Sequence, residues 1–116
     1  MSDTYRDLTR ELSTHIGDIR KEIPDVMQGF SEMAAAALQD GALSKKSKEM
    51  IALAIGIATH CEGCIGFHVK ALVAMGITRQ ELSEVLGMAV YMGGGPSLMY
   101  AAEAMRAFDE FGGDTQ

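Results

Sequence analysis

The chain has 116 residues, of which 47% are hydrophobic and only 6% aromatic, and its formal net charge is -6. This length is most economically one domain, and the acidic balance argues against a nucleic-acid partner and against adsorption to anionic membranes. The longest apolar run, Met50 to Ala58, is far shorter than the roughly 20 residues that span a bilayer.

The first two predicted helices cover residues 3–21 and 24–40, and they carry little obvious chemistry. Pro24 suits the first turn of the second helix, and Gly41 is its stop signal. His15, on the first helix, is expected to be solvated. That helix is amphipathic because its apolar residues recur at spacings of three and four: Leu8, Leu12, Ile16 and Ile19.

The middle of the chain predicts two further helices. Ser44 can cap a helix that turns apolar and runs through Ile57. Thr59 and Glu62 have the spacing of a capping box, in which each side chain bonds the other residue's backbone N–H. The fourth helix is therefore expected to begin at Thr59, to continue through residue 72 and to stop at Gly76.

Two last helices complete an all-α prediction of about six helices. Thr78 and Glu81 form a second capping box, which starts a helix that ends near the glycines at 93–95. Pro96 stands at the start of the final helix, which runs to about Phe111.

The expected organisation is a single domain over residues 1–116, with N-terminal helices over 1–43, a core over 44–111 and a frayed tail over 112–116. The nine methionines are interpreted mainly as core filler, because Met adapts to irregular gaps. The alanine-rich helix surfaces, together with these methionines, hint at helices that are buried against other subunits.

The chemistry gathers around the only two cysteines, Cys61 and Cys64, which are followed by His68. The polar N-terminus has no signal-peptide character, so we expect a cytoplasmic protein, where such a pair is more often redox-active or metal-binding than structural. If a helix begins near Thr59, both thiols and His68 share one face, and the helix N-terminus favours thiolate. The pattern fits thiol–disulfide exchange or peroxide reduction.

Two other interpretations of the cysteines stay open. Free Cys is often a small buried hydrophobe without reactivity. A zinc ion could use Cys61, Cys64 and His68, but His60 would then have to fold back as the fourth ligand, and His15 is too remote to supply a second ligand cluster. We therefore expect no metal and no cofactor.

Residues 47–111 resemble the carboxymuconolactone decarboxylase superfamily, specifically its alkylhydroperoxidase AhpD-like branch. This resemblance implies an all-helical fold that assembles as a homotrimer or homohexamer. It is carried by Lys48-Glu49-Met50-Ile51, Cys61-x-x-Cys64-x-x-x-His68, the segments 71–76 and 78–82, Val90-Tyr91-Met92-Gly93-Gly94 before Pro96, and Phe108-Asp109-Glu110-Phe111 at the end of an Ala-rich helix.

The resemblance also implies four residue roles. Glu49 and His68 would form a proton relay to the thiols, Cys64 would be the peroxide-attacking thiolate that becomes a sulfenic acid, and Cys61 would resolve it to a disulfide. Helix-dipole reasoning by itself favours Cys61 as the attacking thiol, because Cys61 is nearer the expected helix start. No family role falls on His60.

The function expected from these arguments is that of a thiol-dependent peroxidase or disulfide oxidoreductase. Its substrate would be a peroxide or a disulfide, and an external dithiol protein would reduce it. One alternative is a carboxymuconolactone decarboxylase-type enzyme, against which the intact thiol pair argues. Another is a non-catalytic, oligomeric redox-sensing or binding protein of the same fold.

Overall fold

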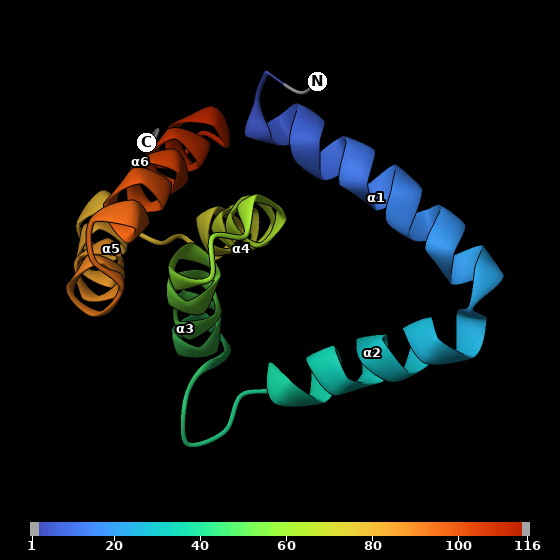
Figure 1. Ribbon diagram of the computed structural model, residues 1–116. Helices are drawn as coiled ribbons and strands as arrows, with labels where there is room; N and C mark the ends of the chain where they lie inside the picture. The colour runs from blue at the N-terminus through green and yellow to red at the C-terminus, as the bar shows by residue number, and fades with distance from the viewer. Residues whose placement is uncertain (1–2, 115–116) are drawn as a thin grey trace.

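The computed structural model describes residues 3–114. Within this range the chain forms six α-helices and no strand, which confirms the predicted all-α class (Figure 1). None of these helices combines the length and the apolar character that crossing a membrane requires. The helices are α1 (Tyr5–Glu22), α2 (Pro24–Ala37), α3 (Lys45–Ala58), α4 (Glu62–Ala74), α5 (Arg79–Gly93) and α6 (Gly95–Glu110).

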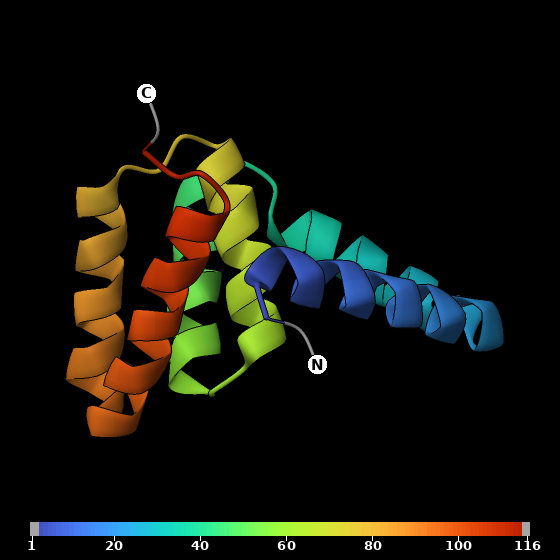
Figure 2. The same cartoon turned by 90° about the horizontal axis from the view of Figure 1, so that it is seen from above.

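Helices α3 to α6 form a bundle around the apolar core, and α1 and α2 extend from it as an arm (Figures 1 and 2). α3 packs against α4 and α5, and α6 packs against the same two helices from the other side. Each fully buried aliphatic or aromatic side chain of this core contributes roughly 1.5–3 kcal/mol. The fully buried members include Leu53, Ile57, Ile65, Leu72, Leu82 and Phe108.

The beginning of α1 is anchored to the bundle by Tyr5, which is 1% exposed. Its ring and Thr9 lie over Gly66 of α4, where an added Cβ would come within 2.7 Å of the Thr9 side chain. The Tyr5 hydroxyl donates to Glu103 at 3.1 Å, and its backbone N–H donates to Glu110 at 2.6 Å. Burial and the Glu103 carboxylate raise the pKa of Tyr5 above its ordinary value, so the hydroxyl remains a donor.

The local signals for most helix ends are confirmed. Ser44 caps α3, its side chain accepting a hydrogen bond from the backbone N–H of Ser47 at 3.0 Å. Thr78 and Glu81 form the predicted capping box of α5. The Thr78 backbone N–H and the Lys46 ammonium hold the pKa of Glu81 below its usual value.

The end of the chain differs in part from the frayed tail expected over 112–116. Residues 115 and 116 lie outside the described residues. Residues 112–114 follow α6 in a turn, in which the Gly113 N–H donates to the Phe108 carbonyl at 2.9 Å and Gly113 is buried.

Helix α2 has no buried residue, and among the described helices it packs only against α1. Its apolar residues Val26, Phe30 and Met33 are 58% to 64% exposed. The interpretation of the methionines as core filler is therefore wrong for Met33 and also for Met88, Met92 and Met99, which are exposed on α5 and α6.

Candidate functional site

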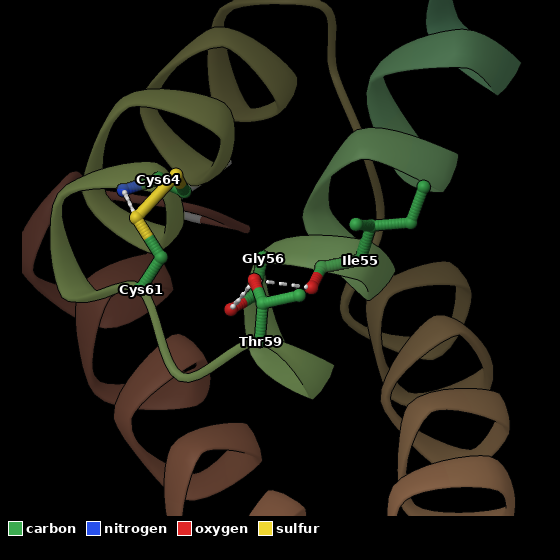
Figure 3. The surroundings of a disulfide bond; sticks show 5 residues. All are labelled: Ile55, Gly56, Thr59, Cys61 and Cys64. Carbon is green, nitrogen blue, oxygen red and sulfur yellow. Dashed lines mark hydrogen bonds between the residues drawn. A yellow bond between two sulfur atoms is a disulfide. The ribbon is translucent and has the colours of Figure 1, made fainter.

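The turn between α3 and α4 places the two cysteines differently from the sequence prediction. Thr59 is the C-cap of α3, and its hydroxyl donates to the Ile55 carbonyl at 2.9 Å (Figure 3). α4 begins only at Glu62, with Cys61 as its N-cap. The capping box predicted for Thr59 and Glu62 is wrong, because the Thr59 hydroxyl is directed back to the helix that it ends.

Cys61 and Cys64 are joined by a disulfide, with their Cα atoms 5.2 Å apart (Figure 3). The Cys61 sulfur also accepts a hydrogen bond from the Cys64 backbone N–H at 3.2 Å, as an N-cap side chain does. On α3, Gly56 faces this pair, and a Cβ there would lie 3.0 Å from the Cys64 Cβ. Glycine at this position therefore allows α3 to approach the cysteine pair closely.

Glu49 of α3 and His68 of α4 meet through a hydrogen bond of 2.5 Å between the Glu49 Oε1 and His68 Nδ1 atoms. The Glu49 side chain is 7% exposed, and that of His68 is 29% exposed. A carboxylate only accepts hydrogen bonds, so Nδ1–H donates and Nε2 remains available for proton exchange. His68 follows Cys64 by four residues on α4, which is the spacing of neighbours on one helix face.

The expected catalytic residues thus fall into two pairs in adjoining helices. Cys61 and Cys64 are covalently linked at the start of α4, and the buried Glu49 carboxylate holds His68 one turn further along. The arrangement offers two sulfur atoms that can exchange two electrons and an imidazole that can carry a proton.

A groove of about 540 Å³ borders the first turn of α4, where Glu62 and Gly63 line it. A groove of about 630 Å³ lies between α1 and α2 and reaches Phe67. The first groove is lined by Thr4, Tyr5, Leu8, Glu11, Leu12, Glu62, Gly63 and Arg106.

His15 lies on α1. His15 is 77% exposed and lies 3.6 Å from Asp18, so its predicted solvation is confirmed. Over residues 3–114, no three His, Cys, Asp or Glu side chains gather in a way that could hold a metal ion.

Sequence reasoning missed the surroundings of His60. This residue adopts a positive φ of 59°, and its ring stacks on Tyr100 of α6 with ring centroids 4.5 Å apart. The two residues are 40 positions apart in sequence, so no local motif joins them. The sequence shows only that a histidine with no predicted role directly precedes Cys61.

The fold and the cysteine pair define an all-helical protein with a C-x-x-C sequence at the start of a central helix. Residues 24–107 match the model of the carboxymuconolactone decarboxylase family. The chain belongs to this family.

Solved and curated proteins show the same relationship. A carboxymuconolactone decarboxylase family protein from Legionella pneumophila, whose crystal structure is of the apo form, is 58% identical. The match covers 95% of this chain and 98% of that one, with a TM-score of 0.91. An uncharacterized protein of Cupriavidus necator is 36% identical over an alignment of 109 positions, which covers 88% of this chain and 96% of the relative. Uncharacterized protein 4 in the cox locus of Paracoccus denitrificans is 30% identical over 101 residues, covering 87% and 91% of the two chains.

Proposed function

We propose that this chain is a thiol-dependent peroxidase of the AhpD-like branch, in which Cys64 attacks, Cys61 resolves and Glu49 and His68 relay protons. The observation that carries the proposal is the buried Glu49 carboxylate on His68, one helical turn beyond the Cys61–Cys64 disulfide. A disulfide with a purely structural role does not require a carboxylate–histidine pair beside it. A reacting thiol needs a group that accepts its proton and returns it to a leaving oxygen.

The first step consumes the peroxide. His68 Nε2 takes the Cys64 proton, and the thiolate attacks one peroxide oxygen, so that an S–O bond forms while the O–O bond breaks. The second oxygen leaves as an alkoxide and receives the proton from His68, which yields an alcohol and a Cys64 sulfenic acid. Glu49 stabilises the positive imidazolium between these two proton transfers.

The second step closes the disulfide. The Cys61 thiolate attacks the Cys64 sulfur, the S–S bond forms, and hydroxide leaves and is protonated to water. Over both steps one hydroperoxide and two thiols become one alcohol, one water and one disulfide. A dithiol protein would then reduce the disulfide by two thiol–disulfide exchanges and be oxidised itself.

The choice of Cys64 as the attacking thiol rests on its spacing to His68. The helix end supports Cys61 instead, because the Cys64 N–H points at the Cys61 sulfur and would stabilise a thiolate there. We give more weight to His68, since an attacking thiol must release a proton that the leaving oxygen later needs. A Cys61 thiolate stabilised by the helix end is also well suited to the resolving step.

The peroxidase proposal is tested by steady-state consumption of an organic hydroperoxide with dithiothreitol as the dithiol donor. We expect many turnovers per chain, and none after both thiols have been alkylated with iodoacetamide. Peroxide consumption that stops after about one equivalent, although dithiothreitol is present, would show that the disulfide is not recycled, as in a redox sensor, and would contradict the proposal. A lactone-decarboxylating activity that survives alkylation would contradict it as well.

We also propose that the chain works as a homotrimer or homohexamer and that the apolar stripe of α2, formed by Val26, Phe30 and Met33, is covered by a second copy. The accessible surface of the chain is 7186 Å², whereas a folded monomer of 12.4 kDa is expected to expose about 6,100 Å². The excess of about 1,000 Å² is similar to the roughly 800 Å² that each partner contributes to a stable interface.

Phe30→Glu tests this interface, because it places a charge in the centre of the stripe. Light scattering should give the mass of a trimer or hexamer of the 12.4 kDa chain for the wild type and a smaller assembly for the variant at the same micromolar concentration. Gln28→Glu is the matched control, since it adds the same charge on the opposite, exposed side of α2. A monomeric wild type, or equal dissociation of both variants, would refute the proposed interface.

A further inference from the structure

Three of the helices within residues 3–114 end in the same hydrogen-bonded turn. In each turn the residue after the C-cap has a positive φ, and it and the next residue donate backbone hydrogen bonds to the last helical turn, as in a Schellman motif. In these three turns the residue with positive φ is Gly76 after α4 (80°), Gly112 after α6 (79°) and His60 after α3 (59°). At His60 the bonds run from His60 N–H to the Ile57 carbonyl and from Cys61 N–H to the Gly56 carbonyl.

The turn beside the cysteines is therefore the exception among the three. Glycine occupies the left-handed position in the other two turns, because it has no Cβ to crowd the following carbonyl. Histidine accepts this conformation better than most residues but less well than glycine. When a residue other than glycine occupies a strained backbone position next to reacting groups, its side chain is expected to have a functional role.

The His60 side chain has one clear partner. Its ring lies on the ring of Tyr100, with centroids 4.5 Å apart and planes only 4° from parallel. Tyr100 belongs to α6, so the stack connects the α3–α4 turn to a helix outside it. Cys61 follows directly, with its N–H bound to Gly56 and its sulfur bound to Cys64.

We propose that His60 is a positioning residue, whose stack on Tyr100 fixes the turn so that the Cys61 sulfur stays within bonding reach of Cys64. This inference rests on the proposed function, since it gives the resolving cysteine its geometry. Pre-organisation raises the effective concentration of one thiol at the other and so favours the disulfide over the dithiol.

The test is the equilibrium of the cysteine pair with glutathione. In this reaction oxidised glutathione takes two electrons and two protons from Cys61 and Cys64, so that one disulfide forms and two glutathione thiols are released. We expect His60→Gly to lower the equilibrium constant for disulfide formation about tenfold, which makes the reduction potential about 30 mV less negative. Thermal stability should be kept or increased, because glycine suits the left-handed turn.

Variants of Tyr100 separate stacking from other effects. Tyr100→Phe keeps the ring and should match the wild type, whereas Tyr100→Leu should shift the equilibrium as His60→Gly does. The double variant His60→Gly/Tyr100→Leu should shift it no further than either single variant, because both remove the same contact. An unchanged equilibrium in His60→Gly, or equal shifts in Tyr100→Phe and Tyr100→Leu, would overturn the inference.

This equilibrium involves no peroxide, so its outcome is independent of the peroxidase assay. A shifted potential without peroxide turnover would refute the proposed function and leave the positioning role intact. Peroxide turnover together with an unshifted reduction potential would refute the positioning role of His60 and leave the proposed function intact.

Discussion

Replacing Cys64 with serine is expected to reduce peroxide turnover to background, a loss of about 10³-fold or more. Serine is close in shape to cysteine and fits against Gly56, so the helix packing should be preserved. Its hydroxyl forms no appreciable anion near neutral pH, and therefore it cannot replace the thiolate as the nucleophile. The measurement is the steady-state rate with an organic hydroperoxide and dithiothreitol.

Cys61→Ser is the matched control, because it removes the other half of the same disulfide. With no reductant present, this variant should still consume about one equivalent of peroxide, whereas Cys64→Ser should consume none. The two variants lose the disulfide equally, so any difference between them reports the attacking thiol. Peroxide consumption by Cys64→Ser and not by Cys61→Ser would reverse the assigned roles.

Glu49→Gln is expected to lower peroxide turnover about 10²-fold, the lower end of what general acid–base catalysis contributes. Glutamine has the shape of glutamate and can still hydrogen-bond His68, but it carries no charge to stabilise the imidazolium. The loss should appear mainly in kcat, because the proton transfer occurs in the chemical step. The glutathione equilibrium of the cysteine pair should stay close to that of the wild type.

Glu62→Gln provides the control for a change of charge near the thiols. Glu62 is exposed and lies in the first turn of α4, nearer to the cysteines in sequence than Glu49 is. Its negative charge opposes a thiolate, so its removal should leave the rate unchanged or raise it slightly. The proton relay is contradicted if Glu62→Gln loses as much activity as Glu49→Gln, or if Glu49→Gln keeps full activity.

The helices and most of their ends could be predicted from sequence because their signals are local. A serine before an amphipathic run, a proline in a first turn and the Thr78–Glu81 pair act within a few residues of the backbone that they cap. Thr59 and Glu62 have the same local pattern, but the capping box predicted from it is wrong. The Thr59 hydroxyl can reach either the helix before it or the helix after it, and only the closed turn decides between them.

The true end of α3 also changes the position of the cysteines relative to the start of α4. The predicted start at Thr59 would have placed Cys61 inside the helix, whereas the structure makes it the N-cap residue. The Glu49–His68 contact was expected only through a family resemblance, since it depends on the close approach of α3 and α4 near Gly56. The His60–Tyr100 stack joins residues that are distant in sequence, and the exposure of the α2 stripe depends on how the helices pack. Local sequence patterns therefore predict neither feature.

The central claim is that Cys64 is the thiol that peroxide oxidises. Its most direct test is to treat reduced Cys61→Ser with one equivalent of hydroperoxide in the presence of dimedone, which traps sulfenic acids, and to locate the adduct by mass spectrometry. The account predicts a dimedone adduct on Cys64 in this variant and none on Cys61 in Cys64→Ser. An adduct on Cys61 in Cys64→Ser, with Cys64 unmodified in Cys61→Ser, would contradict it.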